Sequence, residues 1–547
     1  MLKLLRFLHR EMKGTSARIV AALLIAGLSR GVLLAIFNEG AARAVAHTLT
    51  WQLPASFLGV MVLYLLASYD AIHHSVRAVE IMRERVRVRL AEKLLLAQLR
   101  FLEIKGTGDI YTQLGADLQR LRDAAMTFLN AMQAGVLVAF SLAYLAWLSW
   151  PVFFATLLTG GLGAATYFWI DNDMRARIVH ARGRETALFD ALADTLRGFK
   201  ELKLGRARQR DHAGYVAKLA REFRELWVKT ETLYQLIGIT SQTFMFLLIA
   251  IVAFVLPLFA HTGGTAIFQV VATILFMMAP LESLLQAIPS LAKARVSISS
   301  IERLEANLDS DAAEANDGVV TPLGFETLSF RDVHFRFEGA IAEEGFDVGP
   351  LDLDIRRNEI LFVIGGNGAG KTTFLKLLTG LYPPAQGAIL VDGKVVNDKE
   401  RQSYREMFAA VFGDFHLFTQ LYGLGTPDPA KVTALLEELG IAGKTHIRDG
   451  ALSTVSLSTG QRKRLAYAVN RLADRQIYVF DEFAADQDPQ FRAYFYTELL
   501  PRLKRDGKTV VAVTHDDRWF EVADRVVKMD YGRVAEIAEH SRDGRTS

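Results

Sequence analysis

Long apolar stretches separated by charged segments fill the first half of the chain. A transmembrane helix needs about 20 predominantly apolar residues. The stretches that meet this requirement are Ala17–Phe37, Pro54–Ile72, Phe128–Leu148, Val152–Ile170, Leu236–Phe259 and Ala266–Leu285. Long charged segments follow the second and the fourth stretch, whereas the remaining gaps are short. The pattern predicts a helical membrane domain with six spans, whose charged segments continue the membrane helices beyond the bilayer.

Basic residues follow the same division and predict an orientation. They concentrate in the two long segments, at Arg77, Arg83, Arg85, Arg87 and Arg89 in the first and at Arg175, Arg177, Arg182, Arg184 and Lys200 in the second. Of the short gaps, only the one after the first stretch holds a basic residue, Arg43. By the positive-inside rule, the N-terminus and both long segments lie in the cytoplasm. This consistent asymmetry argues against buried helices of a soluble protein.

The N-terminal residues also have features of a secretory signal peptide. Basic residues precede the first apolar stretch, and Ala44-Val45-Ala46 has the small-x-small form of a cleavage site. The first stretch is nevertheless long enough to span a bilayer, Arg43 adjoins the potential cleavage site, and further spans follow. We therefore expect a retained first helix, preceded by a short amphipathic helix at the inner membrane surface.

The composition agrees with a protein that is partly membrane and partly cytosolic. Hydrophobic residues make up 51% of the 547 residues and the mean hydropathy is +0.19, yet 22% are charged. The absence of cysteine excludes disulfides, thiolate metal sites and cysteine nucleophiles. The net charge of +3 is too small to predict a nucleic-acid partner. Because the apolar character gives way to an acidic, polar segment, we predict a membrane domain at 1–308, a linker at 309–324 and a second domain at 325–547.

A glycine-rich loop indicates the chemistry of the second domain. An apolar strand that begins at Ile360 leads into G-x-x-x-x-G-K-T, and an apolar helix follows. The loop residues are Gly365, Gly366, Asn367, Gly368, Ala369, Gly370, Lys371, Thr372 and Thr373. Glycines let backbone N–H groups surround phosphates, and a helix N-terminus favours negative charge. Lys371 would reach the β- and γ-phosphates of ATP and the Thr372 hydroxyl would bind Mg²⁺, so ATP and Mg²⁺ are the predicted cofactors.

Two carboxylates after another apolar strand complete the predicted hydrolytic site. The strand Ile477–Phe480 ends in Asp481 and Glu482. One carboxylate can hold Mg²⁺, and the next can act as general base on the attacking water. The strand Thr509–Thr514 ends at His515, which is placed to contact the γ-phosphate because ligands gather at strand ends in α/β sheets. Such residues more often have structural roles, and the P-loop upstream favours the functional interpretation.

A second anion-binding segment lies between these motifs. Its residues are Leu457, Ser458, Thr459, Gly460 and Gln461. They place a hydroxyl, a glycine and exposed backbone N–H groups at the start of a helix. In this context the segment resembles the LSGGQ signature of the ATP-binding cassette family, with Thr459 in place of the first glycine. Asp488 falls where that family has its D-loop aspartate, and Phe337 fits the aromatic residue that stacks on adenine.

Six spans before a single cassette resemble the layout of a half-size exporter in that family. The resemblance implies an α-helical six-span membrane domain followed by an α/β nucleotide-binding domain. It also implies a homodimer in which ATP binds between the P-loop of one copy and the signature of the other. Breaks in the cytoplasmic segments, near Gly106–Asp109 and Leu202–Arg208, would be the coupling helices of such an exporter.

One departure from the family pattern concerns the metal. In the run AAVFGDFHLF, which begins at Ala409, Gly413 occupies the place of the glutamine that normally touches Mg²⁺. The adjacent Asp414 could approach the metal directly or through water. The alternative is that Asp414 only caps a turn while water fills the place of the missing side chain.

Three runs resemble a narrower subgroup. They are GFKELKLGRAR, VFGDFHLF and DEFAADQDPQFRAYFYTELLP. The resemblance is to bacterial cyclic-peptide and siderophore-peptide exporters, such as those for pyoverdine precursors and microcin-type peptides. It implies outward transport of a peptide-like secondary metabolite across the bacterial inner membrane. The alternatives are a lipid or multidrug flippase of the same architecture and a membrane ATPase that senses but transports nothing.

Polar residues inside the predicted spans are candidates for a substrate cavity. They are Arg30, Gln133, Gln242, Gln269 and Glu282. Charged groups inside a membrane are costly and usually face a cavity or a partner. Glutamines offer the amide groups that a peptide needs, but they also hold helices together by hydrogen bonds.

Overall fold

The structure is a computed structural model that describes residues 7, 10–11, 16–255, 264–311, 323–337, 346–425 and 427–539. These residues form two compact units. We call them the helical unit, within residues 1–89 and 112–303, and the α/β unit, within residues 90–111 and 304–547. The segment 90–111, which connects two membrane helices along the chain, therefore groups with the α/β unit. The predicted domain boundaries stay a prediction, and residues 312–322 of the linker lie outside the described residues.

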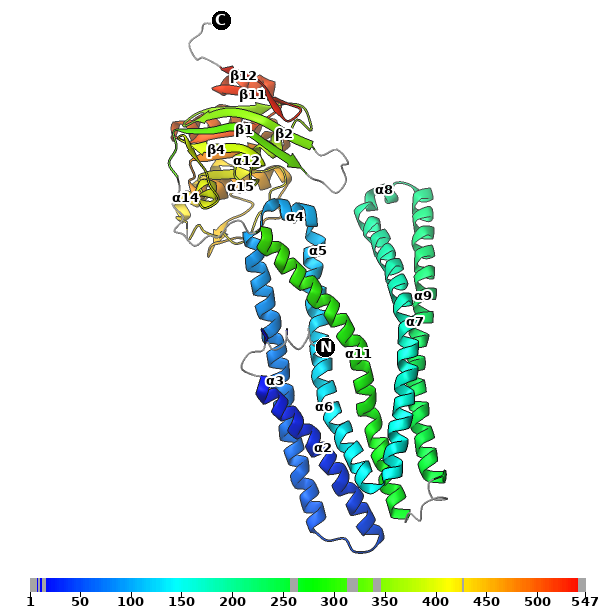
Figure 1. The fold of residues 1–547 in the computed structure, drawn as a ribbon. Coiled ribbons are helices and arrows are strands. Elements are labelled where there is room, and N and C mark those ends of the chain that lie inside the picture. The colour runs from blue at the N-terminus through cyan, green and yellow to red at the C-terminus, as the bar shows by residue number, and fades with distance from the viewer. Residues whose placement is uncertain are drawn as a thin grey trace. The chain divides into compact units, whose positions relative to one another are not determined.

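Long helices make up the helical unit. They are α2 (Ser16–Val45), α3 (Gln52–Leu96), α6 (Leu118–Leu148), α7 (Trp150–Arg197), α9 (Arg206–Ala250) and α11 (Gly264–Asp311). Short elements join or extend them: α8 (Phe199–Lys203) and the π-helical turns η1 (Gln113–Asp117) and η2 (Ile251–Val255). The short helices α4 (Leu99–Lys105) and α5 (Thr107–Thr112, except its last residue), with the last residues of α3 and α11, belong to the α/β unit. The long helices α7 and α9 run side by side, with α8 between them in the chain (Figure 1). The two predicted breaks are thus real, and each holds a short helix.

Four helices in the described part of the chain are long and apolar enough to cross a membrane. They are Ala17–Val45, Gln52–Leu96, Gln113–Leu148 and Ala266–Ile288. The other two predicted spans form shorter apolar segments, Trp150–Thr166 and Gln242–Val255. Every predicted stretch is therefore helical where it is described, but the count of six spans is not confirmed. In the fifth stretch, the polar residues 240–243 shorten the apolar run.

Two glycines bring α2 close to α6. A Cβ atom on Gly27 would lie 2.9 Å from Cβ of Val136, and one on Gly31 would lie 2.4 Å from the ring of Phe140. Their spacing of four residues places both on one face of α2, and this small-xxx-small arrangement lets membrane helices approach closely. This close contact places Arg30 of α2 and Gln133 of α6 in the lining of one cavity, described below.

Two large sheets and a small antiparallel pair, β7 (Ile447–Arg448) and β8 (Ala451–Leu452), lie in the described part of the α/β unit. The first is antiparallel, with the order β2-β1-β4-β5, and comprises β1 (Thr327–Phe337), β2 (Phe346–Arg356), β4 (Gln386–Val391) and β5 (Lys394–Val395). The second has the order β12-β11-β3-β10-β9-β6 and comprises β3 (Ile360–Ile364), β6 (Phe408–Val411), β9 (Ile477–Asp481), β10 (Thr509–Val513), β11 (Arg525–Asp530) and β12 (Arg533–Glu539). Its strands β11, β3, β10, β9 and β6 run parallel. Such strands are covered on both faces, which explains the continuous apolar runs that predicted them.

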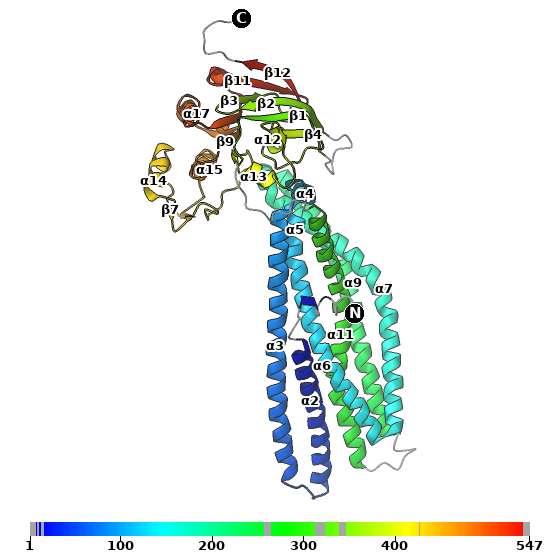
Figure 2. The same ribbon diagram turned by 60° about the vertical axis from the view of Figure 1, so that its left-hand side comes forward.

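Helices cover these sheets. They are α12 (Lys371–Leu378), α13 (Arg401–Arg405), α14 (Pro429–Glu438), α15 (Thr459–Ala473), α16 (Pro489–Tyr494) and α17 (Leu500–Arg505). The remaining short elements are η3 (Phe483–Asp486), η4 (Phe495–Leu499) and η5 (Asp517–Val522). One core joins the antiparallel sheet, α12 and one face of the parallel sheet, and a second joins the other face to α14 through α17. In Figure 2, α14 lies at the opposite end of this unit from β12.

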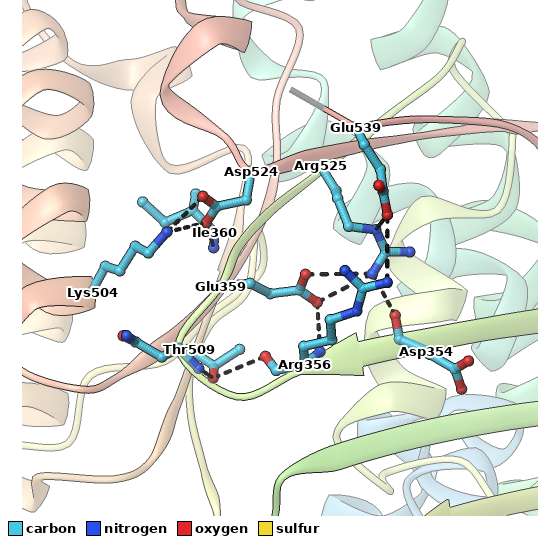
Figure 3. Close-up of polar contacts among 10 residues, drawn as sticks. Asp354, Arg356, Glu359, Ile360, Lys504, Thr509, Asp524, Arg525 and Glu539 are labelled. Atoms are coloured by element: carbon cyan, nitrogen blue, oxygen red, sulfur yellow. Dashed lines mark hydrogen bonds and ion pairs between the residues drawn. The ribbon is translucent and has the colours of Figure 1, made fainter. Parts of the chain in front are cut away.

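A buried charge cluster holds the start of the strand that leads into the P-loop (Figure 3). Glu359, just before β3, pairs with Arg525 of β11 at 3.4 Å, and each side chain is only 7% exposed. Arg525 also donates to the backbone carbonyl of Asp354 at 2.8 Å, and Glu359 accepts the backbone N–H of Arg356 at 2.7 Å. Burial raises the pKa of Glu359, and this N–H and Arg525 oppose the rise. The cluster ties β2, β3 and β11 together.

Candidate nucleotide-hydrolysis site

The P-loop joins β3 to α12 in the predicted way. Gly365, Gly368 and Gly370 have φ values of +151°, +80° and +93°, which side chains other than glycine rarely adopt. A Cβ atom on Gly365 would also lie 2.3 Å from the carbonyl oxygen of Met529. The loop residues Gly365 through Gly370 thus precede the first turn of α12, which begins at Lys371 and contains Thr372 and Thr373.

Lys371 is poised for an anion. Its side chain is buried, and Nζ donates to the carbonyl oxygens of Gly365 and Gly366 at 2.9 and 3.0 Å. No described carboxylate forms an ion pair with it. Two neutral carbonyls do not balance a buried ammonium charge, so phosphate is the partner that this position fits.

Asp481 at the end of β9 lies beside the P-loop helix. Its Oδ2 accepts from the Thr372 hydroxyl at 3.3 Å and from the backbone N–H of Gly413 at 3.4 Å. Burial raises the pKa of Asp481, and the neighbouring Glu482 adds to the rise. A nearby cation would stabilise this buried carboxylate. The hydroxyl and carboxylate oxygens are the hard ligands that Mg²⁺ prefers, so these residues fit the metal.

Glu482 and His515, which the sequence proposed for separate roles, lie next to each other. His515 Nε2 lies 3.2 Å from Glu482 Oε1, and both side chains are half-exposed. Glu482 itself has φ +47°, an uncommon conformation for a residue other than glycine. Such strained residues often occur at functional sites. The carboxylate is therefore held at the open edge of the sheet, where water can reach it.

Lys463 supports this arrangement and was not predicted from the sequence. It lies on α15, its side chain is only 4% exposed, and its Nζ donates to the backbone carbonyl of Glu482 at 2.7 Å. The same Nζ pairs with Asp486 at 2.8 Å. One buried cation thus connects the signature helix to the unusual backbone of Glu482. The spacing of residues 463 and 482 in the chain gives no signal of this contact.

The signature segment forms the start of α15. Ser458 and Gln461 make a capping box, with each side chain bonded to the other's backbone N–H at 3.4 and 3.3 Å. A Cβ atom on Gly460 would lie 2.6 Å from the carbonyl oxygen of Asp486, so this position needs glycine. Leu457 packs against the neighbouring core, and Thr459 is the first residue of the helix. No hydrogen bond joins the described residues of this segment to those of the P-loop.

Asp488 and Phe337 are the remaining predicted contacts of ATP. Asp488 caps α16 by accepting the backbone N–H of Phe491 at 2.9 Å, and this bond and Arg464 lower the pKa of Asp488. Arg464 also lies 3.8 Å above the Phe491 ring. Phe337 ends β1, and its side chain lies outside what the structure describes.

The predicted metal ligand Asp414 is exposed. Among the described residues it forms no hydrogen bond or ion pair, so its role stays a prediction. The preceding Gly413 contributes its backbone N–H to Asp481, and a Cβ atom there would lie 3.7 Å from Asp481 Oδ2. The glycine therefore leaves open space beside the carboxylate.

A polar contact within the α/β unit links α4 to the helix of the P-loop. Glu103 accepts from Lys376 Nζ of α12 at 2.7 Å and forms a short hydrogen bond with the Tyr382 hydroxyl. Tyr382 stacks on Phe335 of β1 with ring centroids 4.5 Å apart. Burial and the Glu103 carboxylate raise the pKa of Tyr382. Helix α4 ends at Lys105, and the φ of +78° at the following Gly106 explains the predicted break.

The predicted cavity residues fall into separate groups within the helical unit. Gln242 Nε2 donates to Glu282 Oε1 at 3.0 Å, and Gln269 donates to the Asn38 carbonyl at 3.3 Å. These contacts join helices, as the alternative interpretation expected. Arg30 and Gln133 instead line one cavity of about 280 Å³.

Comparisons with known proteins cover both the α/β unit and the chain as a whole. A family model described as "ABC transporter" matches residues 348–485. "ATP-binding protein SyrD" of Pseudomonas syringae pv. syringae is 32% identical, over 95% of this chain and 94% of that protein. An "ATP-dependent lipid A-core flippase" of Thiobacillus denitrificans is 25% identical, over 95% of this chain and 92% of its own length. A solved structure of a bacterial Atm1-family ABC exporter with ATP bound shares the fold, with a TM-score of 0.72 at 20% identity over 96% of each chain.

Proposed function

Since this chain belongs to the ABC transporters of the exporter type, we propose that two copies of it export a peptide-like secondary metabolite across the bacterial inner membrane. ATP binding and hydrolysis coupled to transport come with membership of the family. The homodimer, the six spans, the cytoplasmic N-terminus and the substrate class are the parts that we propose. The pair of Glu482 with His515 beside the P-loop carries the assignment of an active hydrolase rather than a silent sensor.

We assign the hydrolytic roles to residues that already lie together. The P-loop N–H groups and Lys371 bind the phosphates, and Glu482 removes a proton from the attacking water while His515 orients its carboxylate. Thr372 and Asp481 would hold Mg²⁺, with Asp414 as a further candidate ligand. The metal would neutralise charge on the phosphates. Lys463 keeps the Glu482 backbone in place.

We propose a dimer because one ATP site needs elements from two copies of the chain. The chain has one P-loop and one signature, and in this family ATP binds between the P-loop of one copy and the signature of the other. In the proposed dimer, Ser458 and Gly460 of one copy face the phosphates held by its partner, and Phe337 stacks on adenine. Asp488 adjoins the same interface.

A peptide-like cargo is supported by the three subgroup runs and by amide side chains in the membrane cavity, Asn130 and Gln133. A specific observation favours a second candidate. The relative from Thiobacillus denitrificans is named as a lipid A-core flippase, so a lipid is the alternative cargo. Membrane lipid surrounds the helices in either case.

The test compares the metabolites of three bacterial strains by mass spectrometry. One strain lacks the protein, one carries only the Glu482→Gln variant, and one carries Glu498→Gln, a control at an exposed position on η4. We expect one peptide-like ion to be missing from the medium and to accumulate inside the first two strains, while the control exports it normally. Loss of general-base catalysis should lower ATPase activity about a hundredfold or more.

Two results would contradict the proposal. If Glu482→Gln hydrolysed ATP near the normal rate, the general base would be wrong. If purified protein in liposomes were strongly stimulated by lipid A but by no peptide, the lipid alternative would replace the peptide cargo.

A further inference from the structure

The strongest unexplained feature of the helical unit is an arginine inside a membrane helix. Arg30 lies near the middle of α2, roughly 20 Å along the helix from either end at 1.5 Å per residue. It lies inside the predicted apolar stretch Ala17–Phe37, seven residues from the nearer end of that stretch. It therefore needs a partner within the protein or from a ligand.

The described structure supplies no anionic partner for Arg30. Its guanidinium lies 5.4 Å from the centroid of the Phe276 ring, a cation–π contact that leaves the charge unneutralised. Glu282, a carboxylate on the same helix as Phe276, accepts its hydrogen bond from Gln242 instead. No described carboxylate forms an ion pair with Arg30.

Three more polar side chains line the cavity that Arg30 faces. Asn130 and Gln133 come from α6 and Ser283 comes from α11. None of the three side chains forms a hydrogen bond with another described residue. Gly27 also lines the cavity, and its close approach to α6 sets Arg30 beside Gln133. Among the described residues, the cavity thus combines one positive charge without an ion-pair partner and amide and hydroxyl groups without hydrogen-bond partners.

Helix α11 adds a backbone acceptor close to this cavity. Pro280, which also lines it, has no N–H, so the carbonyl of Phe276 lacks its usual helical donor. A ligand N–H group could bond to that carbonyl. The cavity volume of about 280 Å³ is just below the range of ligand pockets, about 300–1,000 Å³, and suits one part of a larger molecule.

We propose that this cavity binds a carboxylate of the transported peptide together with the adjoining peptide unit. The inference rests on the proposed function, because it concerns the cargo of the same exporter. Arginine presents a planar fork of N–H donors that matches a carboxylate in two parallel hydrogen bonds. Asn130 and Gln133 pair with the amide groups beside it, which a simple fatty acid would lack.

The test measures binding to the full chain in nanodiscs of phosphatidylcholine without nucleotide. The probes are a BODIPY-labelled apolar hexapeptide with a free C-terminal carboxylate and the same peptide with a C-terminal amide, followed by fluorescence anisotropy. We expect the wild type to bind the carboxylate form about tenfold more tightly or better, the effect of hydrogen bonds to a charged group. Arg30→Gln should bind both forms equally, and Arg30→Lys should keep part of the preference.

Control variants separate this role from a structural one. Arg43→Gln removes the same charge from α2 at an exposed position, where Glu39 is the ion-pair partner among the described residues, so it should keep the full preference. Gln133→Met changes the cavity without removing charge, and should weaken both peptides by a similar factor. It keeps the proposal testable if Arg30→Gln does not fold.

Each other outcome has a defined meaning. If both peptides bind the wild type equally, or if the preference survives in Arg30→Gln, the carboxylate site is overturned while peptide export stands. If lipid A displaces the probes from the wild type but not from Arg30→Gln, the site takes phosphate and the carboxylate assignment is wrong. If neither peptide binds the wild type, both the peptide cargo and the site fall.

Discussion

Replacing Glu103 by Gln tests how the segment 90–111 is coupled to the P-loop helix. Glu103 accepts from Lys376 at 2.7 Å, and the two side chains are 27% and 14% exposed. A hydrogen bond to a charged group contributes about 1.5–3 kcal/mol, and partial exposure reduces this value. The Gln side chain keeps one acceptor oxygen for the two donors, Lys376 Nζ and the Tyr382 hydroxyl, but carries no charge. We therefore expect a loss of about 1–2 kcal/mol in the contact between α4 and α12, a factor of about 5–30 in its equilibrium constant.

The assay measures ATPase activity in proteoliposomes with and without the transported compound. Glu103 lies outside the hydrolytic residues, so the basal rate should stay within about twofold of the wild type. Stimulation by the compound should fall about fivefold or more, since α4 lies between two membrane helices in the chain and contacts the P-loop helix. Glu92→Gln is the matched control, because this exposed residue of α3 lies in the same segment.

A double-mutant cycle with Lys376→Met isolates the pair. Loss of the shared contact should make the double variant no worse than the more severe single variant. Additive losses from Glu103→Gln and Lys376→Met would refute the reasoning, as would unchanged stimulation in Glu103→Gln.

Three further changes probe the α/β unit. Gly460→Ala should lower ATPase activity about tenfold or more, because the added Cβ would lie 2.6 Å from the Asp486 carbonyl oxygen; near-normal turnover would show that this turn can relax. Arg525→Met should lower the free energy of unfolding by about 3 kcal/mol at pH 8, because it leaves the Glu359 carboxylate buried and unpaired. Since burial raises the pKa of Glu359, the folded state takes up a proton as the pH falls, so the loss measured by thermal unfolding should shrink at pH 5; an equal loss at both pH values would contradict this. Asp414→Ala should raise the Mg²⁺ concentration for half-maximal ATPase activity, because the preceding glycine offers no side-chain ligand, and an unchanged Mg²⁺ titration would remove Asp414 from the metal site.

Motifs made of consecutive residues could be read from the sequence. The P-loop with Lys371 and Thr372, and the Asp481-Glu482 pair after an apolar strand, need only local order to place their chemistry. Apolar runs likewise predicted the helices of the membrane domain, because burial in lipid demands length and hydrophobicity. The contact of Glu482 with His515 was not predicted, although both residues follow parallel strands that end at one edge of the sheet.

Contacts between distant residues were decided by the tertiary structure. Glu103 meets Tyr382 across 279 positions of the chain, and Lys463 of α15 holds the backbone of Glu482. No spacing rule predicts such pairs, because they depend on how complete helices and sheets pack. The cavity shows the same division. The sequence marks Arg30 as a charge inside a span, but only the close approach of α2 to α6 at Gly27 places Gln133 in the same cavity, whose described lining holds no carboxylate. Sequence fixes the chemical groups that are present, and packing decides which of them meet and which remain for a ligand.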